Sequence, residues 1–145
     1  MAAADRILVI DDDQSIRKVL SMILAGCGYT VDAVGSGEEA LGKLDSCSYN
    51  LALVDVRLPD IQCTRLLTLL YEKSHRMLKV ILTGFPLSED ALRTISQGVD
   101  GYLAKPINMD QLLKTVRQLL DRQAKERASA PELSAPQDSC EKPIA

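Results

Sequence analysis

The chain has 145 residues, 46% of them hydrophobic and 3% aromatic, which suits one domain whose core is built from Leu, Ile, Val and Ala. Its net charge of -3 comes without a basic stripe, which argues against direct binding of nucleic acid. No apolar stretch is long enough to cross a bilayer, and the N-terminal "MAAADR" lacks the apolar core of a signal peptide, so we expect a cytoplasmic protein without membrane contact.

Five short apolar runs alternate with stretches of helical spacing. The runs are "ILVI" (7–10), "TVDAV" (30–34), "LALV" (51–54), "KVIL" (79–82) and "GYLA" (101–104). The helical stripes that follow them contain Ile16 to Leu24, Ala40 to Leu44, Leu66 to Leu70, Leu92 and Ile95, and Leu112 to Leu120. This alternation predicts an α/β fold, with an open, doubly wound, five-stranded parallel sheet and five helices.

Local signals place the ends of several of these helices. The first helix is expected to stop at "GCGY" (26–29), because glycine is common just past a helix end. Ser36 and Glu39 have the spacing of a capping box before the second helix, and Asn108 opens the fifth. After residue 124 the composition shifts to Ala, Pro, Ser and charge, so we expect a domain over 1–124 and a disordered tail or linker over 125–145.

Polar side chains follow four of the five runs. In chain order these are Asp11 and Asp12, then Asp55, then Thr83 with Gly84, and finally Lys105. The second run ends instead in the uncharged "GSG" (35–37). The carboxyl ends of parallel strands lie along one edge of the sheet, where ligands bind, so we expect these side chains to share one rim. The need of every strand to leave the core through polar residues explains one or two of these positions, but not the whole set.

Acids crowded at one rim need a counter-charge. Two carboxylates about 4 Å apart repel by roughly 4 kcal/mol at an effective dielectric constant of about 20. One lysine cannot cancel three acids, whereas oxygen ligands at an open edge suit Mg²⁺, which commonly bridges to a phosphate. We therefore predict that Asp11, Asp12 and Asp55 hold Mg²⁺. Asp13, which directly precedes the first helix, fits an N-cap or a first-turn acid better than a metal ligand.

Asp55 stands at the end of the middle run, in "LVDVRLPD" (53–60). A carboxylate can attack phosphorus and form an acyl phosphate, while Mg²⁺ neutralises the transferred oxygens. Thr83 and Lys105 would hold the phosphoryl group through hydroxyl and ammonium contacts. The sequence thus predicts phosphoryl-acceptor chemistry at Asp55.

Four motifs, in this order and spacing, give the chain its resemblance to a known family. They are "ILVIDDD" (7–13), "LVDVRLPD" (53–60), "VILTG" (80–84) and "GYLAKPI" (101–107). Over about residues 5 to 123 the chain resembles the receiver domain of two-component response regulators. The resemblance implies the strand order 2-1-3-4-5 and a signalling switch rather than an enzyme. Asp55 would accept a phosphoryl group from a sensor histidine kinase or a phosphotransfer protein, and the domain would assist its own phosphorylation and dephosphorylation.

The resemblance also implies roles for single residues. Asp11, Asp12 and Asp55 match the Mg²⁺-binding acids, the backbone carbonyl of Arg57 a further ligand, Thr83 the switch hydroxyl, Lys105 the phosphate-contacting lysine, and Tyr102 the aromatic that moves with Thr83. The bond between Lys105 and Pro106 would be cis. The face of the fourth helix, fifth strand and fifth helix would change on phosphorylation and control a partner protein, an output domain or a second copy of the chain.

Some residues depart from the family pattern. Gln62 and Cys63 stand where many receivers have an acid and a glycine, and losing glycine removes easy access to positive φ, so the loop after Asp55 is expected to take a different path. Gly101 stands where receivers with a charged dimer network carry an acid.

Three alternatives remain open. The first is a degenerate receiver that only binds partners. The second is a phosphohydrolase resembling the haloacid dehalogenases, which is disfavoured because Arg57 replaces their second Asp. The third is a flavodoxin-like electron carrier, which is disfavoured because Asp11 to Asp13 would repel a phosphate.

Overall fold

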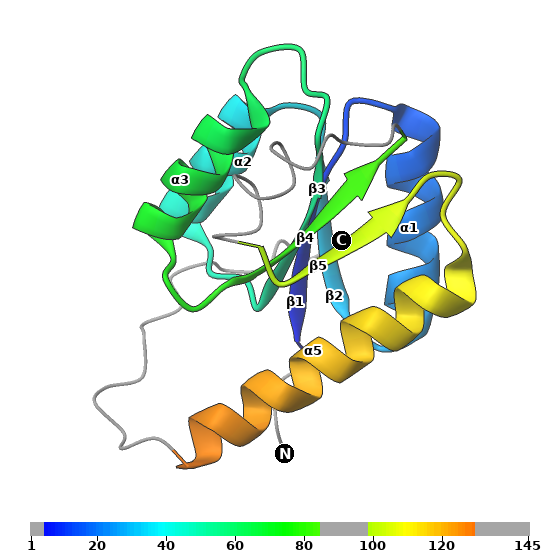
Figure 1. The fold of residues 1–145 in the computed structure, drawn as a ribbon, viewed down its shortest axis with the longest axis vertical. Helices are drawn as coiled ribbons and strands as arrows, with labels where there is room; N and C mark the ends of the chain where they lie inside the picture. The colour runs from blue at the N-terminus through cyan, green and yellow to red at the C-terminus, as the bar shows by residue number, and fades with distance from the viewer. Residues whose placement is uncertain (1–4, 85–98, 130–145) are drawn as a thin grey trace.

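The structure is a computed structural model that describes residues 5–84 and 99–129 (Figure 1). Five parallel strands form one sheet in the order β2-β1-β3-β4-β5. The strands are β1 (Arg6–Ile10), β2 (Thr30–Val34), β3 (Leu51–Asp55), β4 (Leu78–Thr83) and β5 (Gly101–Ala104). Both the predicted fold class and the strand order implied by the resemblance are confirmed.

Helices cover both faces of the sheet. Those in the described residues are α1 (Gln14–Gly26), α2 (Gly37–Ser46), α3 (Cys63–Lys73) and α5 (Met109–Ser129). Helices α2 and α3 lie on one face, and α1 and α5 on the other (Figure 1). None of the helices in the described part of the chain has an apolar stretch long enough to cross a membrane.

Two predictions concern the fourth helix and the end of the domain, which lie partly or wholly outside the described residues. The fourth helix, expected around Leu92 and Ile95, lies outside them. Helix α5 continues to Ser129, past residue 124, where the sequence places the end of the domain. Residues 130–145 are not described, so the disordered tail stays a prediction.

Helix α1 begins and ends as the sequence indicates. The Asp13 carboxylate accepts hydrogen bonds from the backbone N–H groups of Ser15 and Ile16, at 2.8 and 3.3 Å, so Asp13 is the N-cap. The helix ends at Gly26, and Gly28 follows with φ of 99°, a conformation that glycine adopts without steric cost.

The other predicted caps are formed, one of them on one side only. Ser36 Oγ accepts from the N–H of Glu39 at 3.1 Å, but the Glu39 carboxylate accepts from the N–H of Gly35 at 3.4 Å instead of returning to the Ser36 N–H. The capping box is therefore half formed. Asn108 Oδ1 accepts from the N–H of Gln111 at 3.0 Å and caps α5.

The sheet is packed on both faces, which fixes the points where its strands end. Leu8 and Ile10 of β1 belong to the core beneath α2 and α3, whereas Ile7 and Val9 belong to the core beneath α1 and α5. Alternate side chains of a strand point to opposite faces, so one apolar run serves both cores. Residues directly after such a strand are therefore held at a defined place on the rim.

Candidate functional site

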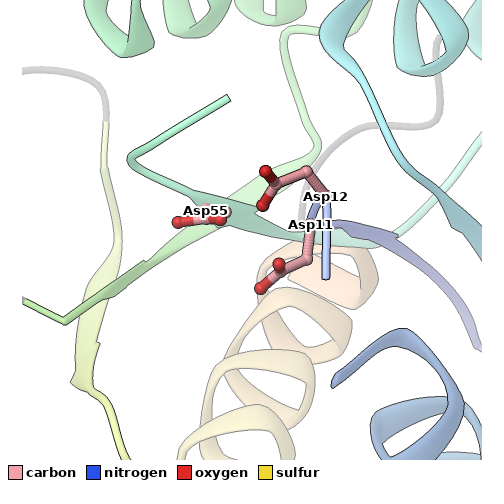
Figure 2. Close-up of side chains that lie close together, drawn as sticks. All are labelled: Asp11, Asp12 and Asp55. Atoms are coloured by element: carbon pink, nitrogen blue, oxygen red, sulfur yellow. The ribbon is translucent and has the colours of Figure 1, made fainter. Parts of the chain in front are cut away.

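Three carboxylates meet at the carboxyl-terminal edge of the sheet. Asp11 and Asp12 follow β1, and Asp55 is the last residue of the neighbouring strand β3. One oxygen from each carboxylate lies within 4.8 Å of the other two (Figure 2). Asp11 and Asp55 are buried and Asp12 is exposed. The structure thus brings the three predicted metal ligands together.

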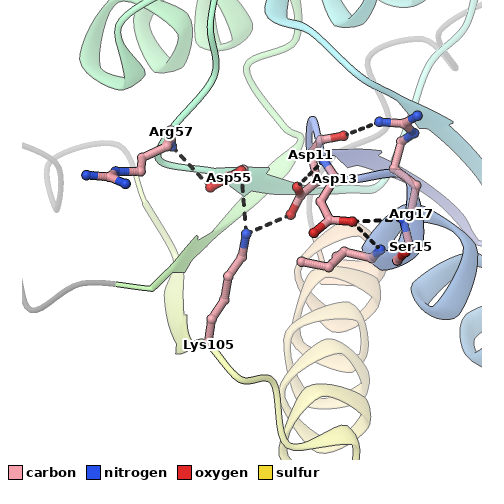
Figure 3. A network of polar contacts seen from close by, with 8 residues as sticks. Asp11, Asp13, Ser15, Arg17, Asp55, Arg57 and Lys105 are labelled. Carbon is pink, nitrogen blue, oxygen red and sulfur yellow. Dashed lines mark hydrogen bonds and ion pairs between the residues drawn. The ribbon is translucent and has the colours of Figure 1, made fainter.

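Asp11 is fixed by contacts to its backbone and its side chain (Figure 3). Its N–H donates to the carbonyl of Val34 at 3.1 Å, and its carbonyl accepts from Arg17 Nη1 at 2.8 Å. Its Oδ1 accepts from the N–H of Asp13 at 2.9 Å. These bonds leave Oδ2 turned toward the shared space, where it meets Lys105.

Lys105 reaches these acids from the end of β5, as the strand spacing predicts. Its Nζ lies 3.0 Å from Asp11 Oδ2 and 3.5 Å from Asp55 Oδ2 (Figure 3). Burial acts to lower the pKa of Lys105, but the hydrogen bond and charge of Asp11, together with Asp55, outweigh it, and the pKa is raised. Lys105 is therefore a firmly held positive charge. Its bond to Pro106 is cis, the geometry that the resemblance implies.

The environment of Asp55 disfavours its charge. Burial is the main cause that raises the pKa of Asp55, to about 6. A hydrogen bond from the N–H of Arg57, at 3.1 Å, acts in the opposite direction, while the negative charge of Asp11 adds to the rise. One ammonium thus leaves the acids incompletely neutralised, and a donor set made only of oxygens fits a hard divalent cation such as Mg²⁺.

The remaining predicted site residues lie at the end of β4, within β5 and in the loop after β3. Thr83 is the last residue of β4, the strand between β3 and β5. Tyr102 lies in β5 and is 37% exposed. The Arg57 side chain is exposed and points away from the carboxylates, so only its backbone faces Asp55 (Figure 3).

The loop after Asp55 connects to α3 without strain. Gln62 has φ of -70° and precedes the helix, and Cys63 is its first residue. Within residues 5–84 and 99–129 no residue other than glycine has positive φ, so the chain reaches α3 without the conformation that only glycine adopts easily. The Cys63 thiol is buried, which, with the charge of Asp55, raises its pKa to about 11.

Two contacts at this rim were not predicted from the sequence. The first joins Arg17 of α1 to the carbonyl of Asp11. The second joins Asp60, in the β3–α3 loop, to the N–H groups of Gly37 and Glu38 at the start of α2, at 3.0 and 2.9 Å. The only sequence signal for the second was a capping-type residue, Asp60, in a loop far from the helix that it caps.

Known proteins resemble the chain over most of its folded part. The model of the response regulator receiver domain matches residues 7–117. The transcriptional regulatory protein PcoR of Escherichia coli is 31% identical over 124 residues, which make up 86% of this chain and 55% of PcoR. The chain likewise spans 53% of the transcriptional regulatory protein PmrA of Pectobacterium parmentieri, so it covers about half the length of these relatives.

Solved structures agree with the family model. A CheY-like response regulator receiver domain protein from Methanospirillum hungatei JF-1 is 36% identical with a TM-score of 0.80, covering 85% of this chain and 98% of that one. The response regulator protein TrrA from Thermotoga maritima, solved in complex with Mg(2+)-BeF, is 33% identical with a TM-score of 0.71, covering 79% of this chain and 98% of that one. The chain belongs to the family of response regulator receiver domains.

Proposed function

We propose that this chain is a phosphorylation-activated switch in which Asp55 accepts a phosphoryl group from a sensor histidine kinase or a phosphotransfer protein. The observation that carries the proposal is the convergence of three carboxylates on one space, with an ammonium 3.0 and 3.5 Å from two of them. Membership in the receiver family supports it, since receiver domains of response regulators are signalling proteins.

Asp11, Asp12 and Asp55 would hold Mg²⁺, together with the backbone carbonyl of Arg57. When bound, Mg²⁺ neutralises the oxygens of the transferred phosphoryl group. The donor set of carboxylates at an open strand edge supports this assignment. So does the related TrrA structure, which is a complex with Mg(2+)-BeF.

The chemistry of the transfer follows from the groups at the rim. A carboxylate oxygen of Asp55 attacks phosphorus, the bond between phosphorus and the donor nitrogen breaks, and an acyl phosphate forms. Lys105 and Thr83 would hold the phosphoryl oxygens by ammonium and hydroxyl contacts. The same two side chains would remain in place when water attacks the acyl phosphate, so the domain would assist both its phosphorylation and its dephosphorylation.

The signal would leave the site through Thr83. Phosphorylation adds negative charge at Asp55, Thr83 moves toward it, and Tyr102 changes its position with Thr83. The face that includes β5 and α5 would then rearrange and control a partner protein, an output domain or a second copy of the chain. We place this switch in the cytoplasm and expect this segment to make no direct contact with nucleic acid or membrane.

The test is a mass measurement after incubation with Mg²⁺ and acetyl phosphate. The wild type should gain one phosphoryl group and Asp55→Asn none. Asp13→Asn is the matched control, because it makes the same change of charge at a residue whose capping role asparagine can keep. An unchanged gain in Asp55→Asn would show that another residue is the acceptor. No gain in the wild type would favour a degenerate receiver that only binds partners.

A further inference from the structure

The turn between β2 and α2 contributes no side chain to the proposed phosphoryl chemistry, yet both sides of the candidate metal centre contact it. The β2–α2 turn, residues 35–38, is the uncharged "GSG" followed by Glu38. Asp60 contacts it from the loop after Asp55, and Arg17 contacts it from α1, beside Asp11. The turn therefore lies between the two segments that carry the proposed metal ligands.

Asp60 binds the turn with both of its carboxylate oxygens. Oδ1 accepts from the N–H of Gly37 at 3.0 Å, and Oδ2 accepts from the N–H of Glu38 at 2.9 Å. The first N–H groups of a helix have no partner within the helix, and they favour a negative charge. These hydrogen bonds lower the pKa of Asp60, so its carboxylate stays charged and bound.

Close packing adds to the hydrogen bonds. A Cβ atom at Gly37 would lie 2.3 Å from Cγ2 of Ile61, so the tip of the loop rests against the turn with no room for one methyl group. Gly37 is buried at this contact. The loop tip is therefore held by two polar bonds and one apolar contact.

The tip of the loop is joined to the acceptor by backbone contacts. Arg57 and Gln62 form an isolated antiparallel bridge, which closes the loop at its base. The N–H of Arg57 donates to Asp55 Oδ1 at 3.1 Å. Holding the tip at Asp60 thus restricts the base of the loop, where Asp55 and the carbonyl of Arg57 lie.

Arg17 links the other end of the same turn to the segment that carries Asp11. Arg17 Nη1 donates to the carbonyl of Asp11 at 2.8 Å. A Cβ atom at Gly35 would lie 3.0 Å from that same nitrogen, so the guanidinium packs closely on the turn. The β2–α2 turn therefore contacts a group that holds Asp11 as well as the loop that follows Asp55.

We propose that Asp60 is a positioning residue for phosphoryl acceptance: by fastening the β3–α3 loop to the β2–α2 turn, it holds Asp55 and the Arg57 carbonyl in the arrangement that Mg²⁺ and the phosphoryl group require. The inference rests on the proposed function. It gives the turn after β2 a task at the site.

The test compares the Mg²⁺ dependence of phosphorylation by acetyl phosphate in Asp60→Ala and in the wild type. Substituting a residue that orients metal ligands typically lowers the metal affinity by about 10- to 100-fold. The half-saturating Mg²⁺ concentration of Asp60→Ala should therefore rise about tenfold or more. The rate at saturating Mg²⁺ should fall much less. Asp60→Asn keeps one acceptor oxygen and should recover part of the loss.

Asp45→Ala is the matched control. Asp45 lies at the other end of α2 and pairs with Lys73 of α3, so its removal also deletes a carboxylate that links α2 to the segment after β3. Its half-saturating Mg²⁺ concentration should equal that of the wild type. Unfolding in urea without Mg²⁺ would show that both variants are folded.

A second pair of variants tests the apolar half of the contact. Gly37→Ala pushes against Ile61 and should also raise the half-saturating Mg²⁺ concentration, even though alanine is the better helix former. Adding Ile61→Ala makes room for the new methyl group and should reverse the change. If Asp60→Ala and Gly37→Ala both show the Mg²⁺ dependence of the wild type, the inference about Asp60 is wrong, while the proposed function still stands. A wild type that accepts no phosphoryl group overturns the proposed function together with it.

Discussion

Lys105 lies between two buried carboxylates, with its Nζ 3.0 Å from Asp11 Oδ2 and 3.5 Å from Asp55 Oδ2. The three residues come from the ends of three different strands. The Lys105 ammonium, which would contact a bound phosphoryl group, is thus the counter-ion of Asp11 and Asp55 when no phosphoryl group is bound. Within residues 5–84 and 99–129, Lys105 is the cation that pairs with both of these acids.

Replacing Lys105 should therefore destabilise the metal-free protein. Lys105→Met leaves Asp11 and Asp55 buried without their cation, and the free energy of unfolding should fall by about 1–3 kcal/mol. Mg²⁺ should reduce this loss, because it would neutralise the same carboxylates. Urea unfolding in EDTA and in Mg²⁺ measures both values. An equal loss of unfolding free energy in EDTA and in Mg²⁺ would show that Lys105 and Mg²⁺ do not neutralise the same carboxylates.

Mg²⁺ should stabilise the folded protein through Asp12. Asp12 is exposed, so Asp12→Asn leaves no buried group without a partner, and in EDTA it should raise the stability because it removes a charge that repels Asp11 and Asp55. The same variant should lose most of the rise in melting temperature that Mg²⁺ gives the wild type, since only the folded protein gathers the three acids. Asp13→Asn, one residue away, should keep that rise. A rise that survives in Asp12→Asn would remove Asp12 from the ligand set.

Much of this rim could be predicted from the sequence, for a geometric reason. Parallel strands end on one edge, so Asp11, Asp12 and Asp55 had to lie near one another once their runs were recognised as strands. The reach of Lys105 also followed, because two strand spacings amount to roughly 10 Å. Caps such as Asp13 were predictable because their partners lie only two or three residues away.

Contacts between loops were not predictable in this way. Asp60 and Gly37 are 23 residues apart, and they meet only because α2 and α3 pack side by side on the same face of the sheet. The capping box at Ser36 formed only in part for a different, local reason, because the Glu39 carboxylate accepts a hydrogen bond from Gly35, the residue before Ser36. The contact between Asp60 and Gly37 depends on tertiary packing, which no short pattern records.

Cys63 should be an unreactive thiol despite its place near the acceptor. With a pKa of about 11, it is about one-thousandth thiolate at pH 8, whereas an ordinary thiol with a pKa near 8.5 is roughly a quarter thiolate. Iodoacetamide at pH 8 should therefore label the exposed Cys27 at least about a hundred times faster than the buried Cys63. Peptide mapping by mass spectrometry measures the two rates. Comparable rates would contradict the buried environment of this first residue of α3.

Lys79 gives the chain a pH-dependent stability that can be separated from the metal centre. This β4 residue is only 3% exposed, and burial is the main cause that lowers its pKa, although Asp100 acts in the opposite direction. Its Nζ donates to the carbonyl of Met77 at 3.1 Å and lies 5.5 Å from the centre of the Tyr71 ring.

The sign of the effect follows from the bound protons. Between the lowered pKa of folded Lys79 and the value of about 10.4 in the unfolded chain, the unfolded state binds more protons, so stability rises with pH across that window. Lys79→Met has no such group, so the wild type should gain stability relative to this variant as the pH increases toward about 10.4. Urea unfolding at several pH values gives the difference, and Lys18→Met, at an exposed lysine, serves as the control. A difference that stays constant with pH would mean that the Lys79 ammonium remains as well solvated in the folded protein as in the unfolded chain.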